Sequence, residues 1–213
     1  MNILEEISQN LQDGKAKTVK ELVEKAVQDG LDAEIILNDG LLKGMGIIGE
    51  KFKRDEVYVP DVLIAARAMK AGTEILKPLL VKDGVKAVGK VVIGTVSGDL
   101  HDIGKNLVRM MMEGKGLEVI DIGVDVSAEK FIETAIRENA QIIACSALLT
   151  TTMGEMEAVV KAAKKSGIRG NVTIMVGGAP LTDSFCKKIG ADIYSPDAAS
   201  AATEAYKVCT RVA

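Results

Sequence analysis

The hydrophobic residues of this chain change their spacing near residue 85. Before that point, apolar side chains recur every three or four residues, which predicts amphipathic helices with one face in a core. Four such helices joined by short polar turns predict a small four-helix bundle over residues 1–85. Its apolar stripes are Ile3, Leu4, Ile7 and Leu11; Val19, Leu22, Val23, Ala26 and Val27; a segment from Ala33 to about Phe52; and Val62, Ala66, Met69, Thr73 and Leu76 in a helix opened by Pro60 and ended by Pro78.

From residue 86 onward, short apolar runs alternate with amphipathic segments. Continuous Val and Ile runs separated by helices are typical of a parallel sheet covered on both faces. The pattern therefore predicts a flavodoxin-like or Rossmann-like α/β domain with five parallel strands over residues 86–213. The expected strands are 91–96, 117–123, 141–147, 172–178 and 191–195, and the expected helices lie near 102–115, 127–139, 152–166, 181–189 and 197–210. Ligands of such sheets bind in the loops after the strands, which here begin near Ser97, Gly123, Ser146 and Gly177.

Composition excludes several classes of protein. The content of 47% apolar residues predicts a globular core. The net charge of -3 and the scattered lysines leave no basic stripe for nucleic acid. No apolar run approaches the length of a membrane span, and the acidic start "MNILEEISQN" differs from a signal peptide. We therefore expect a cytoplasmic protein with neither nucleic acid nor a membrane as partner. Cys145, Cys186 and Cys209 are odd in number and widely spaced, which favours buried free thiols.

The segment "GMGIIG" at 44–49 fits the GxGxxG pattern of dinucleotide-binding proteins. That fingerprint works only where a strand turns into a helix, because the helix N-terminus must meet the pyrophosphate. Here the pattern lies inside a segment with helical spacing. We interpret these glycines as positions where helices pack closely.

The single histidine, His101, lies in "GDLHDIGKNL", directly after the first predicted strand. Asp99 could accept one ring N–H and leave the other nitrogen available. Gly104 removes a side chain beside it. These residues allow three interpretations: a polar helix-capping loop, a general base assisted by Ser97 or Asp102, or one axial ligand to a metal that an organic cofactor carries.

Three motifs in register resemble those of the cobalamin-binding family that takes its cofactor base-off and histidine-on. "DLHDIG" (99–104) resembles DxHxxG, "SAL" (146–148) resembles SxL, and "GG" (177–178) resembles the family's glycine pair. Forty-one residues separate the first motif from the second, and 28 separate the second from the third, which is the usual spacing in that family. The resemblance implies cobalamin as the cofactor.

The resemblance also implies how the cobalt is held. His101 would replace the nucleotide base as the lower axial ligand, and Asp99 would bind the distal nitrogen of its ring. In the family a hydroxyl often extends this pair, and "LLTTTM" offers Thr150, Thr151 and Thr152, with Thr152 favoured by its offset from SxL. The alternative for these threonines is that they cap the next helix.

The remaining motif residues would accommodate the bulk of the cofactor. Gly104 would leave room for a large group beside the histidine. Ser146 and Leu148 would line a channel for the displaced nucleotide tail. Gly177 and Gly178 would let the backbone approach that tail without a Cβ in the way.

The first half is similar to the helical cap of methyl-transferring corrinoid proteins, including the cobalamin module of methionine synthase, through "GMGIIGEKFKRDEVYVPDVLIAARAM". This similarity implies a methyl cap over residues 1–85, a cobalamin-binding domain over 86–213, and a hinge around Gly89. Some apolar bundle residues are expected in the core of the bundle rather than against the cofactor, namely Met45, Val62, Leu63 and Met69.

The function implied by the resemblance is a corrinoid methyl carrier, which is not an enzyme on its own. A donor-specific methyltransferase would load it to give methylcobalamin, a second methyltransferase would pass the methyl to a thiol or to tetrahydrofolate, and a reductive activator would rescue oxidised cobalt. Methylamines, methanol, betaines and methoxylated aromatics all stay open as methyl donors.

Three other functions share parts of this pattern. The small subunit of an adenosylcobalamin-dependent mutase would carry the three motifs but would not need the cap. A cobalamin-responsive regulator would add a DNA-reading domain, and no basic helix-turn-helix is visible. A flavodoxin-like signalling or flavin domain would share the fold and leave the motif register unexplained.

Overall fold

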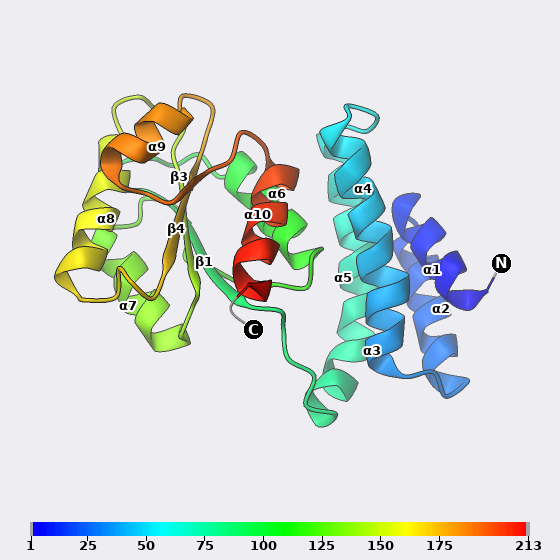
Figure 1. Ribbon diagram of the computed structural model, residues 1–213. Coiled ribbons are helices and arrows are strands. Elements are labelled where there is room, and N and C mark those ends of the chain that lie inside the picture. Colours follow the sequence, from blue (N-terminus) through cyan, green and yellow to red (C-terminus); the bar gives the residue numbers. More distant parts are fainter. Residues whose placement is uncertain (1, 212–213) are drawn as a thin grey trace. The chain divides into compact units, whose positions relative to one another are not determined.

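A computed structural model describes residues 2–211 (Figure 1). The chain divides into two compact units: the first runs to Ala87 and includes Gly114–Gly116, and the second comprises Val88–Glu113 and the residues from Leu117 onward. The first unit is helical and the second is a five-stranded parallel α/β unit, which confirms the predicted fold class. The roles expected for residues 1–85 and 86–213, a methyl cap and a cobalamin-binding domain, stay predictions at this point.

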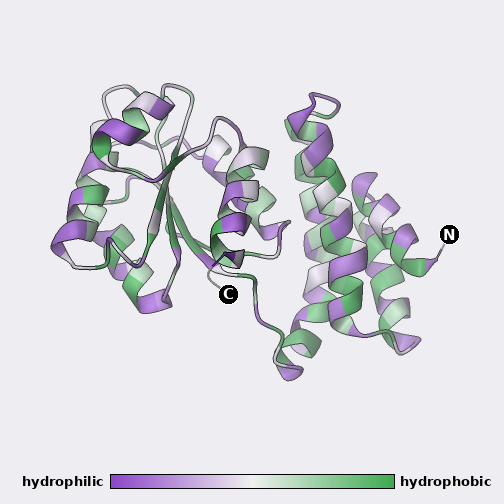
Figure 2. Ribbon diagram, viewed as in Figure 1, coloured by the Kyte–Doolittle hydropathy of each residue, from purple (hydrophilic) through white to green (hydrophobic). Residues whose placement is uncertain are grey.

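The helical unit follows the predicted apolar stripes. Its elements are α1 (Ile3–Gln12), α2 (Ala16–Gln28), α3 (Ala33–Ile35), the π-helix η1 (Ile36–Leu42), α4 (Lys43–Lys53) and α5 (Val59–Lys82). Hydrophilic and hydrophobic stretches alternate along these helices in Figure 2, as amphipathic helices require. Ile7, Leu11, Val19 and Val62 are fully buried, so the stripes meet in one core.

The glycines of "GMGIIG" lie within α4 and not at a strand end. A Cβ on Gly44 would come within 3.0 Å of the Ser8 carbonyl oxygen, so α4 packs closely on α1 at this position. Gly44 therefore serves helix packing as predicted, whereas a Cβ on Gly46 would meet nothing within 4 Å, so the prediction does not hold for that glycine.

The helical unit differs from the prediction in three places. Pro78 was expected to end the last helix, but α5 continues to Lys82, because a proline removes only one helical N–H bond and Pro78 lies on the exposed side of the helix. The segment 36–42 is a π-helix, which the apolar spacing did not indicate. Met45, Val62 and Met69 are buried as expected, whereas Leu63 is 42% exposed.

The α/β unit contains a single parallel sheet with strand order β2-β1-β3-β4-β5. The strands are β1 (Lys90–Thr95), β2 (Glu118–Asp121), β3 (Ile142–Ser146), β4 (Thr173–Gly177) and β5 (Ile193–Tyr194). The helices are α6 (Ile103–Glu113), α7 (Ala128–Glu138), α8 (Gly154–Lys165), α9 (Asp183–Ile189) and α10 (Ala198–Thr210). In Figure 1, α6 and α10 lie on one face of the sheet and α7, α8 and α9 on the other. The strand order reverses at β1, so β1 and β3 end at the point where such sheets bind ligands.

The core on the α7 side is built around Phe131. Its ring is fully buried, and a Cβ on Gly94 of β1 would lie 2.8 Å from the ring carbon Cζ. Ile143 and Val176 belong to the same buried cluster. The glycine in β1 thus lets the aromatic ring pack directly on the strand.

The three cysteines are free thiols, but only two are buried. Burial raises the pKa of the Cys145 thiol to about 12, so this thiol stays neutral and unreactive. Cys209 is partly exposed, contrary to the expectation that all three are buried. A Cβ on Gly89 would lie 2.3 Å from Cys209 Sγ, so the glycine expected at the hinge is itself closely packed.

No helix among residues 2–211 is long and apolar enough to cross a membrane.

We expect the Phe131→Ala variant to lose about 3–5 kcal/mol of unfolding free energy, because removing the ring leaves a cavity against β1. Ile136→Ala is the matched control, since Ile136 lies on the same helix and is 51% exposed; its unfolding free energy should change by less than about 0.5 kcal/mol. Urea unfolding followed by circular dichroism measures both, and equal losses would contradict this account of the core.

Candidate functional site at the carboxyl edge of the sheet

The predicted site residues lie in loops that follow β1, β3 and β4. In a parallel sheet these loops meet at the same edge. The registers pair Thr95 with Ser146 and Ser146 with Gly177, so the three strands end level with one another. The sequence motifs are therefore brought together by the topology of the sheet.

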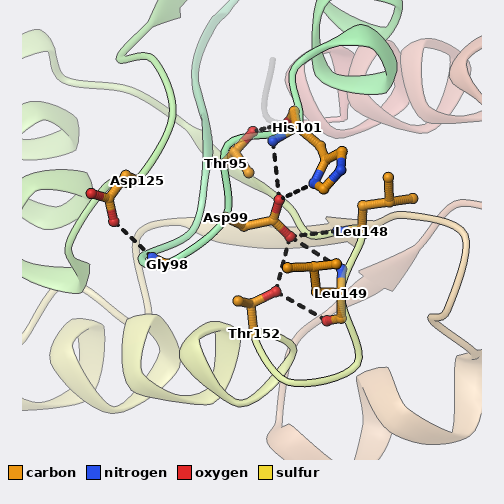
Figure 3. Close-up of polar contacts among 8 residues, drawn as sticks. All are labelled: Thr95, Gly98, Asp99, His101, Asp125, Leu148, Leu149 and Thr152. Atoms are coloured by element: carbon orange, nitrogen blue, oxygen red, sulfur yellow. Dashed lines mark hydrogen bonds and ion pairs between the residues drawn. The ribbon is translucent and has the colours of Figure 1, made fainter.

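His101 is held by Asp99 (Figure 3). Its ring nitrogen Nδ1 lies 2.7 Å from Asp99 Oδ1, and its backbone N–H donates to the same oxygen at 3.1 Å. A carboxylate beside Nδ1 fixes a proton on that nitrogen and leaves Nε2 with its lone pair. The histidine side chain is 52% exposed, whereas Asp99 is fully buried. The arrangement therefore presents one oriented ring nitrogen at the edge of the sheet.

The other oxygen of Asp99 receives three donors from the loop after β3. The N–H groups of Leu148 and Leu149 donate to Oδ2 at 2.8 and 3.2 Å, and the Thr152 hydroxyl lies 2.9 Å from it. Burial by itself would raise the pKa of Asp99, but the hydrogen bonds from the Leu148 N–H, from His101 and from Thr152 outweigh it and hold this pKa well below its usual range. Asp99 is therefore a carboxylate at neutral pH, although it is inaccessible to water.

Of the three candidate threonines, the structure places only Thr152 in this network. Thr152 is buried, and its hydroxyl can reach either Asp99 Oδ2 or the Leu149 carbonyl oxygen, 3.0 Å away. Its hydroxyl makes no capping bond to α8, whose N-cap is Met153. Thr150 and Thr151 are exposed, and within residues 2–211 neither has a hydrogen bond to Asp99 or His101. The assignment of Thr150 to the site stays a prediction.

Two further residues fix the histidine loop, and sequence reasoning missed both. The buried Thr95 hydroxyl donates to the His101 carbonyl oxygen at 2.8 Å. Asp125 accepts the Gly98 N–H at 2.7 Å, and its own N–H donates to the Asp99 carbonyl oxygen at 3.0 Å. Asp125 follows β2 and has a φ of 53°. The sequence signal that could have indicated Asp125 is its polar side chain just after the predicted strand 117–123.

The first turn of α6, which follows the histidine, is tied to β2. The ammonium group of Lys105 is buried and lies 2.5 Å from Asp121 Oδ2, and Arg109 Nη1 reaches the same oxygen at 3.0 Å. Burial alone would raise the pKa of Asp121, but the hydrogen bonds from Lys105 and the Gly123 N–H and the charge of Arg109 hold it below its usual range. These ion pairs therefore anchor α6 to β2.

The second glycine of the pair, Gly178, is required by the backbone itself. Gly178 has a φ of 140°, and a Cβ there would lie only 1.9 Å from the Ala147 carbonyl oxygen. Gly177 lies level with Ser146, and its carbonyl oxygen accepts the Ala147 N–H at 3.3 Å. The loops after β3 and β4 therefore approach more closely than any side chain would allow.

Two models of a B12 binding domain match this chain, one over residues 3–77 and one over residues 89–205. A corrinoid protein of Desulfitobacterium hafniense is 40% identical over 211 residues, which is 98% of each chain. Trimethylamine corrinoid protein 2 of Methanosarcina acetivorans is 41% identical over 203 residues, covering 92% of this chain and 94% of that protein. A chain in the crystal structure of the methanol:cobalamin methyltransferase complex MtaBC from Methanosarcina barkeri superposes with a TM-score of 0.88 at 28% identity, over 98% of this chain and 80% of that one.

The chain belongs to the B12-binding corrinoid proteins of methyltransferase systems. This confirms the family and the cofactor class that the three motifs predicted. It also accounts for the first half, because a B12 binding domain model matches the helical unit as well as the α/β unit.

The residues around His101 in this corrinoid protein fit a large, flat and mostly apolar group. Leu100 and Ile103 flank the histidine and are 72% and 76% exposed, and Leu148 and Leu149 of the neighbouring loop are 43% and 40% exposed. We call these four residues the apolar rim. Large apolar side chains exposed together mark a binding surface. A Cβ on Gly104 would meet nothing within 4 Å, so the chain itself leaves this position open.

We expect Asp99→Asn to lower the free energy of unfolding at pH 7 by about 1–3 kcal/mol, because an amide cannot accept all the donors that the carboxylate accepts. The folded-state pKa of Asp99 lies below its unfolded value, so its stabilisation is present above about pH 4 and is lost as the pH falls through the folded pKa. The difference between wild type and variant should therefore stay constant from pH 7 to about pH 5 and shrink as the pH falls below about 4.

Urea unfolding at several pH values measures this difference. Asp102→Asn is the matched control, because Asp102 lies in the same loop but is exposed. A wild-type advantage over Asp99→Asn that stays constant down to pH 3 would contradict the assignment of a charged, buried Asp99.

Proposed function

We propose that this chain carries a methyl group between two methyltransferases, on a corrinoid held base-off with His101 as its lower axial ligand. The observation that carries the proposal is the network in which the buried Asp99 carboxylate holds His101 Nδ1 and leaves Nε2 at a partly exposed edge. Support comes from relatives about 40% identical over nearly the whole chain, one of them called a trimethylamine corrinoid protein.

Each residue of the network has a task toward the cofactor. When bound, the corrinoid supplies the cobalt that accepts and releases the methyl group. His101 would bind the metal through Nε2 while Nδ1 keeps its proton. Asp99 accepts that proton's hydrogen bond, which raises the basicity of Nε2. Thr152 and the N–H groups of Leu148 and Leu149 stabilise the negative charge on Asp99, so the proton stays on the ring and is not taken by the carboxylate.

The rest of the edge would bind the remainder of the cofactor. The apolar rim would contact the macrocycle, and Gly104 would leave it room. Ser146 and Leu148 would line the channel of the displaced nucleotide tail, with Gly177 and Gly178 at its far side. We assign the helical unit the task of covering the methyl group, because methyl cargo has to be shielded from water between transfers.

We infer that the partners are a donor-specific methyltransferase, an acceptor methyltransferase that uses a thiol or tetrahydrofolate, and a reductive activator. The methyltransferase complex among the similar structures supports the first of these. The free thiols Cys145 and Cys186 are typical of a reducing compartment, which supports a cytoplasmic location.

His101→Ala should fold normally, bind cobalamin at least about 10-fold more weakly, and change its electronic spectrum, because the variant removes the proposed metal ligand. The test is to reconstitute wild type and variant with cobalamin and record paramagnetic resonance spectra of the cobalt(II) state. Nitrogen superhyperfine splitting should be present in wild type and absent in His101→Ala. Asp99→Asn serves as the comparison and should perturb the same signal less. Identical spectra for wild type and His101→Ala would refute histidine ligation.

The carrier role predicts that one methyltransferase and its substrate will transfer a labelled methyl group to the reduced, cobalamin-loaded protein. Candidate enzymes for methylamines, methanol, betaines and methoxylated aromatics should be tested one by one, with His101→Ala as the control that transfers more slowly. If none of them labels the wild-type protein, the carrier role is wrong.

A further inference from the structure

A row of four residues crosses the carboxyl edge of the sheet, one from each of four neighbouring strands. Thr95 pairs with Ser146, and Ser146 pairs with Gly177. The last pair between β4 and β5 is Val176 with Tyr194, and one residue further on, a Cβ on Gly177 would lie 3.4 Å from the Ser195 carbonyl oxygen. Ser195 therefore continues the row beyond Gly177.

The residues of this row share one face of the sheet. Side chains alternate between the faces along a strand. Cys145, Val176 and Tyr194 pack with the buried cluster on the α7 side. Their successors Ser146, Gly177 and Ser195 therefore lie on the opposite face. The two serines are then two strand spacings apart, about 10 Å, with only a glycine between them.

Ser195 has a buried hydroxyl on this face that lacks a hydrogen-bond partner within residues 2–211. The residue is only 7% exposed, and its Oγ has no hydrogen-bond partner among the described residues. Its backbone is fully engaged, since the Ser195 N–H donates to the Val176 carbonyl oxygen at 3.2 Å. A buried hydroxyl without a partner costs about 1–3 kcal/mol, so an alanine would suit the isolated chain better.

The other hydroxyls of the row already have a use or a proposed one. Thr95 donates to the His101 carbonyl oxygen. Ser146 is the serine proposed to line the tail channel. Ser195 lies on the same face, beyond Gly177. A group that extends from below His101 along this row would therefore reach Ser195.

We propose that the Ser195 hydroxyl forms a hydrogen bond with the nucleotide tail of the bound corrinoid, so that Ser195 selects corrinoids with a complete tail. This inference rests on the proposed base-off binding, in which the tail leaves the cobalt and enters the protein. The tail brings ribose, phosphate and base atoms that accept or donate hydrogen bonds. Any of these gives Ser195 Oγ the partner that the chain does not provide.

The test compares cobalamin with cobinamide, a corrinoid that lacks the nucleotide tail. Apoprotein is titrated with each and the Kd values are measured from absorbance. Wild type should bind cobalamin more tightly than cobinamide. Ser195→Ala should raise the Kd for cobalamin by about 2–10-fold, the size of one hydrogen bond, and leave the Kd for cobinamide unchanged.

Thr134→Val is the matched control. Thr134 also has a buried hydroxyl without a partner among the described residues, but it lies within α7 on the other face of the sheet. This variant should leave both Kd values unchanged. A second measurement is thermal unfolding of the apoproteins, in which Ser195→Ala should be as stable as wild type or more stable. A destabilised Ser195→Ala apoprotein would instead assign the hydroxyl a structural role and overturn the proposal.

The outcomes separate this inference from the proposed function. Wild type that binds cobalamin more tightly than cobinamide, with the full difference retained in Ser195→Ala, overturns the role of Ser195 alone. An equal loss for both corrinoids does the same, because cobinamide has no tail to contact. Wild type that binds neither corrinoid, or both equally, contradicts base-off binding and with it this inference.

Discussion

The candidate site depends on one buried carboxylate. Asp99 is inaccessible to water, and a charge there would be costly without partners. Five donors from two loops surround it: the His101 ring and N–H, the N–H groups of Leu148 and Leu149, and the Thr152 hydroxyl. Because each oxygen serves one loop, the carboxylate joins the loop after β1 to the loop after β3. Removing its charge would release both loops, and with them the orientation of the histidine.

The sheet makes this junction possible and sets its limits. Neighbouring parallel strands end level, so two loops distant in sequence meet over one carboxylate. The same geometry brings the loops after β3 and β4 so close that Gly178 cannot carry a Cβ. The Asp99 charge and its hydrogen bonds lie at the ends of β1 and β3. At the end of β5 lies the hydroxyl of Ser195, with Gly177 between it and Ser146.

The amino-acid sequence predicts much of this molecule, and the failures have physical reasons. Apolar spacing located every strand, because buried parallel strands are continuous Val and Ile runs. Motif spacing located Asp99 and His101. It could not indicate Thr95 or Ser195, whose positions follow from register across strands and not from neighbours in sequence. The prediction that Pro78 ends the last helix is wrong, because losing one backbone hydrogen bond on the exposed side costs less free energy than ending a helix that packs well.

The exposed apolar rim is surface that the chain does not use in its own core. Leu100 and Ile103 precede and follow the oriented histidine in sequence and are largely exposed, although the fold buries comparable side chains elsewhere. Burying such surface is worth about 25 cal/mol per Å², so a flat apolar partner would gain free energy from contacts that the isolated chain leaves unmade. A ligand that binds only the folded state also stabilises it. The polar network therefore orients the histidine in advance, and the rim supplies affinity once a partner of the right shape arrives.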